Sequence, residues 1–123
     1  MNYALWGLQG LLALAMVGAG AMKAFTPRQK LAEKMKWVAS WTDLNVKLLG
    51  LAELLGAIGL IAPGALGFAP FLTPLAATCL AVLMVGAIKT HLDLKEPIVA
   101  PAVLTVIAIA IVVGRVLFVP LGQ

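Results

Sequence analysis

The chain has 123 residues, of which 63% are hydrophobic and only 11% are charged. Soluble domains carry about 25% charged residues, so this chain has too little polar surface for a soluble globule, and the composition predicts a membrane protein. The net charge of +4 does not indicate nucleic-acid binding, because five of the nine Lys and Arg residues lie between residues 23 and 36, in one short loop. Such a loop is typical of the cytoplasmic side of a membrane protein.

Four apolar segments predict an all-α integral membrane four-helix bundle, in which each helix crosses about 30 Å of hydrocarbon. They cover residues 3–22, 44–62, 71–88 and 99–119 of a single transmembrane domain, 1–123. The first ends near an Ala-Gly-Ala sequence that resembles a signal-peptide cleavage site. Since no basic residue precedes its apolar run, we interpret it as a retained helix.

The loop between the first two apolar segments predicts a short amphipathic helix at about residues 27–40. Thr26 and Pro27 are typical of a helix start, the former as N-cap and the latter as first helical residue. Apolar residues then recur at helical spacing among basic ones, and two tryptophans suit the membrane interface: Leu31, Met35, Val38, Trp37 and Trp41. A surface-lying helix that orients the chain accounts for this pattern.

Loop charges predict the orientation of the bundle. The first loop is strongly basic, the second (63–70) is uncharged, and the third carries Lys89, His91, Asp93, Lys95 and Glu96. The positive-inside rule places loops one and three in the cytoplasm and both chain ends on the outer side. Arg115, near the outer end of the fourth helix, disagrees mildly with this orientation.

Glu53 lies near the middle of the second apolar segment, where a carboxylate is costly unless it is paired, protonated or next to water. Gly50 and Gly56 on its own helix face favour close helix packing around it. A rise of 1.5 Å per residue places three polar residues in the outer half, above Glu53: Gln9, Thr78 and Arg115. Either Glu53 is a structural charge held by Arg115 or Gln9, or it lines a ligand pocket or relays a proton.

Single copies of two residue types limit the chemistry of the chain. Cys79 has no partner for a disulfide or a redox-active pair, and His91 alone excludes a bis-histidine haem or multi-histidine metal centre within one copy. We predict no metal site. His91 is a residue that changes charge near neutral pH, or else an ordinary interfacial residue.

Three parts of the sequence resemble the DoxX-like family of small bacterial membrane proteins. They are the end of the first helix (Gly-Ala-Gly-Ala-Met-Lys-Ala-Phe, 18–25), the segment Glu-Leu-Leu-Gly-Ala-Ile-Gly-Leu-Ile (53–61), and His91 after the third helix. The resemblance implies a four-helix bundle in a bacterial inner membrane. The family takes its name from a subunit of a thiosulfate:quinone oxidoreductase. Lys23, Glu53 and His91 are the site candidates carried over, without catalytic roles.

The leading functional hypothesis is an accessory or binding subunit with a polar site at Glu53 for a small apolar ligand, a quinone or a lipid, linked to redox or oxidative-stress functions. We expect no cofactor of its own, and a homodimer or a membrane complex. The alternatives are a proton-coupled transporter acting as an oligomer, an enzyme acting on a lipid-soluble substrate, and a scaffold. The sequence leaves open whether the protein is an enzyme.

Overall fold

The computed structural model describes residues 2–34 and 36–120, and these residues form helices without any strand. In chain order the helices are α1 (Asn2–Phe25), α2 (Arg28–Lys34), η1 (Lys36–Ser40), α3 (Asp43–Leu66), α4 (Leu72–Asp93), α5 (Val99–Val113) and η2 (Gly114–Phe118). Here η1 is a 3-10 helix and η2 a π-helix that continues α5.

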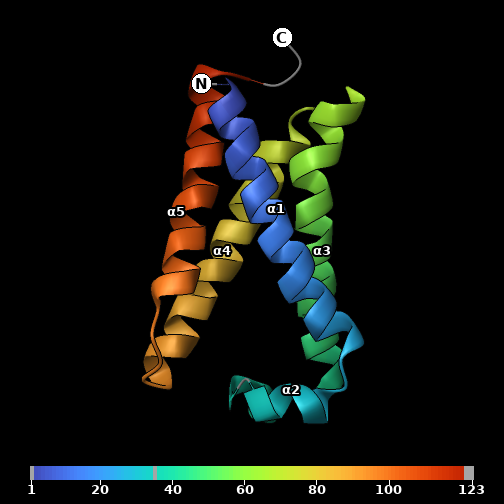
Figure 1. Ribbon diagram of the computed structural model, residues 1–123, viewed down its shortest axis with the longest axis vertical. Helices are drawn as coiled ribbons and strands as arrows, with labels where there is room; N and C mark the ends of the chain where they lie inside the picture. The colour runs from blue at the N-terminus through green and yellow to red at the C-terminus, as the bar shows by residue number, and fades with distance from the viewer. Residues whose placement is uncertain (1, 35, 121–123) are drawn as a thin grey trace.

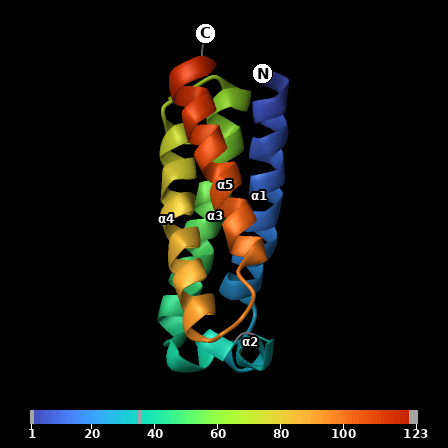
Figure 2. The ribbon, with the colours of Figure 1, turned by 90° about the vertical axis from the view of Figure 1, so that its left-hand side faces the viewer.

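Four of these helices are long and apolar enough to cross a membrane: α1, α3, α4, and α5 together with η2. They run alternately up and down, with α2 and η1 at one end of the bundle and the start of α1 and the end of η2 at the other (Figures 1 and 2). We call these the α2 end and the terminal end. The prediction of an all-α, multi-pass membrane bundle is confirmed.

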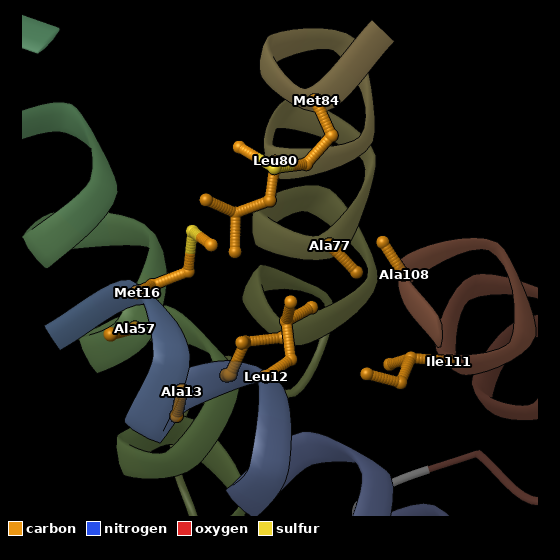
Figure 3. Close-up of a cluster of buried hydrophobic side chains, with 10 residues drawn as sticks. Leu12, Ala13, Met16, Ala57, Ala77, Leu80, Met84, Ala108 and Ile111 are labelled. Carbon is orange, nitrogen blue, oxygen red and sulfur yellow. The ribbon is translucent and has the colours of Figure 1, made fainter. Parts of the chain in front are cut away.

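The core of the bundle is one cluster of buried side chains to which all four long helices contribute. Leu12 and Met16 of α1 point toward Leu80 of α4, and Ile111 of α5 belongs to the same cluster (Figure 3). Large apolar side chains also cover the outside, among them Leu14, Leu55, Val82 and Ile109, each more than half exposed. Lipid is the solvent that makes such a surface stable.

Helix α3 is longer than the predicted 44–62. It begins after Thr42, whose hydroxyl accepts a hydrogen bond from the Asn45 N–H at 3.1 Å, and it continues through Pro63 to Leu66. A proline inside a helix leaves the carbonyl four residues earlier without a donor. The Thr73 hydroxyl donates to that carbonyl, Gly59 O, at 2.9 Å. This bond from α4 explains why the helix does not end at Pro63.

Helix α4 also continues past the predicted end at residue 88, as far as Asp93. His91 and Lys89 therefore lie on its last turns and not in a loop. The i,i+4 pair that such a continuation allows is present, with Lys89 Nζ at 3.1 Å from Asp93 Oδ2. Its exposure makes it a weak contributor to stability.

The segment after α1 departs from the single helix predicted at about 27–40. It contains the seven-residue helix α2 and, separately, the 3-10 helix η1. The apolar side chains still turn inward: Leu31 and Val38 are buried together with Val46 of α3. This small second core holds the segment against the start of α3, and the tighter winding of η1 is common in short helical pieces. Met35 lies outside the described residues.

Helices α1 and α3 touch through backbone at Gly20 and Gly50. A methyl group added to Gly50 would lie 2.6 Å from Gly20 O, and one added to Gly20 would lie 2.7 Å from Gly50 O. Gly56 makes the next contact of α3, against Leu80 of α4. The predicted close packing on both sides of Glu53 is therefore present, with glycines as the contact residues.

Candidate functional site

Glu53 and Lys23 form a buried ion pair at the crossing of α1 and α3. The distance from Lys23 Nζ to Glu53 Oε1 is 2.7 Å, and the side chains are 12% and 1% exposed, respectively. Lys23 packs against Gly50, where an added methyl group would lie 2.9 Å from Lys23 Cβ, and Glu53 follows one turn later on α3. The close approach of the two helices thus brings the Lys23 ammonium within reach of the Glu53 carboxylate.

The second carboxylate oxygen of Glu53, Oε2, is buried and accepts no hydrogen bond from the described residues. A carboxylate has about four lone-pair sites, so a single bond from Lys23 leaves it under-satisfied. Removing Lys23 would leave a buried charge without compensation, which is far more costly than the loss of a surface pair. Lys23 therefore favours the charged form of Glu53, which burial in an apolar helix disfavours.

A cavity of about 430 Å³ lies beside this pair, between α3 and α4 at the α2 end. Its walls are mostly apolar, with polar groups from α1, α3 and α4. The lining residues are Lys23, Trp37, Trp41, Leu49, Glu53, Val82, Leu83, Met84, Gly86, Ala87, Thr90 and His91. This combination of apolar walls and a few convergent polar groups is typical of small-molecule sites.

Two tryptophans close the cavity on the side of the α2–η1 segment. Trp37 and Trp41 pack edge to face, with ring centroids 5.1 Å apart and an interplanar angle of 76°. The Lys23 ammonium lies 5.8 Å from the Trp37 ring centroid, a cation–π distance. The two tryptophans are four residues apart, a spacing that in the sequence predicts two rings on the same side of the segment.

His91 lines the cavity from α4, close to the end of that helix. Its Nδ1 lies 3.4 Å from Glu96 Oε1, without a well-formed hydrogen bond, while the Glu96 N–H donates to the His91 carbonyl at 2.8 Å. The Thr90 hydroxyl donates to Gly86 O of its own helix. Of the predicted site residues, the structure thus brings Lys23, Glu53 and His91 to one cavity.

Arg115 and Gln9 belong to a separate network at the terminal end. Arg115 Nε donates to Gln9 Oε1 at 2.7 Å, and its Nη1 donates to Asn2 Oδ1 at 2.8 Å and to Val119 O at 3.0 Å. Gln9 Nε2 in turn donates to Leu60 O at 2.6 Å. The network ties α1, α3 and the end of η2 together through neutral acceptors.

One of the two alternatives for Glu53, a structural pairing with Arg115 or Gln9, is therefore wrong. The Glu53 carboxylate accepts a hydrogen bond from Lys23, near the end of α1, whereas Arg115 donates to Gln9 and to the carbonyl of Val119 at the terminal end. Long side chains in membrane helices extend toward the nearer interface. The rise per residue gives the depth of each Cα along its helix but not the direction in which the side chain extends, so it could not separate Arg115 from Glu53.

Thr78 lies outside both clusters. Its side chain is exposed, its hydroxyl donates to Pro74 O of its own helix at 2.8 Å, and it borders an apolar groove between α3 and α4 together with Cys79. Such back-bonding satisfies a hydroxyl without a partner helix. Thr78 therefore joins neither the cavity nor the Arg115 network.

The model of the DoxX-like family matches residues 7–114, a range that includes Lys23, Glu53, His91 and both tryptophans. The chain belongs to the DoxX-like family. No curated protein and no solved structure matches it. Within the described part of this DoxX-like protein, no group of three or more His, Cys, Asp and Glu side chains is placed to hold a metal ion.

Proposed function

We propose that this DoxX-like protein is a binding or accessory subunit whose cavity at the α2 end takes a small lipid-soluble ligand, with a quinone as the leading class. The observation that carries the proposal is the position of Lys23 on the cavity wall. It is a charged donor, 12% exposed, in an otherwise mostly apolar space of about 430 Å³. Sites for small molecules have about 300–1,000 Å³.

The chemistry of the walls matches a flat ring that carries carbonyl groups. An ammonium has three N–H donors, and Glu53 Oε1 accepts one of them. A second can reach a ligand carbonyl. The edge-to-face pair of Trp37 and Trp41 offers an aromatic surface for the ring. The hydrogen bond to Glu53 Oε1 fixes the position of the Lys23 ammonium on the cavity wall.

The same proposal places the protein in a bacterial inner membrane, with the α2 end in the cytoplasm and both chain ends outside. The basic residues of the α2–η1 segment support this orientation through the positive-inside rule. We further propose that the protein acts as a homodimer or in a membrane complex. Since Cys79 has no second cysteine for a redox-active pair, a link to redox or oxidative-stress chemistry would run through partner proteins.

Quenching of tryptophan fluorescence tests the binding. A short-chain benzoquinone quenches an indole it touches, so titration of the purified protein in lipid nanodiscs should give saturable quenching from Trp37 and Trp41. The Trp6→Phe variant, which changes a residue beside Arg115, should keep that signal. The Trp37→Phe/Trp41→Phe variant should lose it.

Two further variants separate the cavity from the rest of the bundle. Lys23→Met should weaken quinone binding about tenfold or more, because a charge-assisted hydrogen bond is lost. Thr78→Val, on the lipid-facing side of α4, should leave binding unchanged. Quenching that rises linearly without saturation, or that is the same in Lys23→Met and the parent protein, contradicts the proposal.

A further inference from the structure

We infer that Glu53 sets the charge selectivity of the cavity: by neutralising Lys23, it restricts the site to neutral head groups and excludes carboxylates and other anions. The inference rests on the proposed function and adds a property that the family match does not carry. It assigns Glu53 a role in specificity that acts through Lys23, without contact between its carboxylate and the ligand.

The geometry of the ion pair supports this role. Glu53 is 1% exposed and lies behind Lys23, which is 12% exposed, so the ammonium is the part of the pair that a ligand meets. With a carboxylate oxygen 2.7 Å from that ammonium, the pair has no net charge. It therefore offers N–H donors to a ligand oxygen but no net attraction to an anion.

The remaining described walls of the cavity do not supply a second fixed positive charge. Lys23 is the only Lys or Arg among its described lining residues, and the other titratable group, His91, lies 3.4 Å from the carboxylate of Glu96. An entering anion would thus meet one neutralised ammonium and a second carboxylate near the wall. In apolar surroundings, an anion without its own counter-charge is strongly disfavoured.

The state of Glu53 Oε2 indicates how the cavity would respond to loss of the negative charge. This oxygen receives no hydrogen bond from the described residues, so Lys23 is the only group seen to compensate the carboxylate. In Glu53→Gln, an amide of nearly equal size remains next to Lys23, but the ammonium becomes an unpaired cation. The cavity then becomes a site that attracts anions.

Two naphthoquinones that share the same ring and the same alkyl tail test the inferred charge selectivity. In the first compound position 2 carries a methoxy group and the ligand is neutral. In the second it carries a hydroxyl group, which is ionised at neutral pH. The unmodified protein should bind the neutral compound at least about tenfold more tightly, since only the anion adds an unpaired charge. Glu53→Gln should reverse this preference, and Lys23→Gln/Glu53→Gln, which offers an anion no counter-charge, should again favour the neutral compound.

The outcomes separate the two proposals. If the unmodified protein binds neither compound, the proposed function is contradicted and the selectivity with it. If it binds both with equal affinity, or if Glu53→Gln keeps the original preference, the cavity is a ligand site but Glu53 does not select by charge. Equal affinity of the unmodified protein for both compounds would overturn the inference even if Glu53→Gln does not fold.

Discussion

Glu53 is a carboxylate within an apolar helix, and a single neighbour, Lys23, determines whether it can remain charged. The pair is nearly closed to solvent, with a separation of 2.7 Å. Arg115 shows a different solution, because neutral oxygens of Gln9, Asn2 and Val119 receive its N–H groups near the end of η2. Helix C-termini favour cations, so this guanidinium is stable without a carboxylate.

Substitution of Lys23 by methionine should lower the free energy of unfolding by about 3 kcal/mol, because it leaves Glu53 buried without its partner. Thermal or denaturant unfolding in detergent measures the loss. Lys23→Met/Glu53→Leu should recover most of it, since both charges are then gone. Lys89→Met, which breaks the exposed pair with Asp93, should change little. Equal effects of Lys23→Met and Lys89→Met would contradict the structural role of the buried pair.

At the scale of elements, the contact of α1 with α3 positions the site. The two helices approach so closely at Gly20 and Gly50 that a side chain at either position would overlap backbone atoms of the other helix. Three residues further along each helix lie Lys23 and Glu53. A change in the distance between the helices therefore changes the ion pair and the cavity at the same time.

Gly50→Ala should destabilise the bundle by about 1–3 kcal/mol, as other overpacked positions do. It should also weaken ligand binding, because separating α1 from α3 moves Lys23 away from Glu53. Gly18→Ala is the matched control, since a methyl group there meets no atom within 4 Å. Unfolding and quenching titrations of both variants check the prediction, and a Gly50→Ala protein as stable as Gly18→Ala would refute the close contact.

At the scale of the whole molecule, the helices form a bundle that carries an ion pair and a cavity at one end and, at the other, Arg115 with its neutral acceptors. The segment between α1 and α3, which contains α2 and η1, lies at the α2 end and contributes both tryptophans of the cavity (Figure 1). This segment also carries four of the nine Lys and Arg residues: Arg28, Lys30, Lys34 and Lys36. The segment on which the proposed orientation rests therefore also lines the proposed ligand site.

The orientation can be measured with single cysteines in a Cys79→Ser background. Lys30→Cys, in the exposed part of α2, should resist a membrane-impermeant maleimide added to intact cells and react after the cells are opened. Phe68→Cys, in the exposed turn between α3 and α4, should react in intact cells. The opposite labelling pattern would invert the proposed topology.

The sequence by itself determined the membrane class, the four helices and their family, because hydrophobic length and loop charge are local properties of the chain. It also identified Glu53, since a charge in an apolar run is visible without any partner, whereas Lys23 and His91 became candidates through the resemblance to the DoxX-like family. The partner of Glu53 was decided by tertiary structure: Lys23 is 30 residues away, and only the Gly20–Gly50 contact brings it within 2.7 Å. The separation of Gln9 and Arg115 from that pair, and the place of Trp37 and Trp41 in the cavity, depend in the same way on side-chain direction and on the packing between helices.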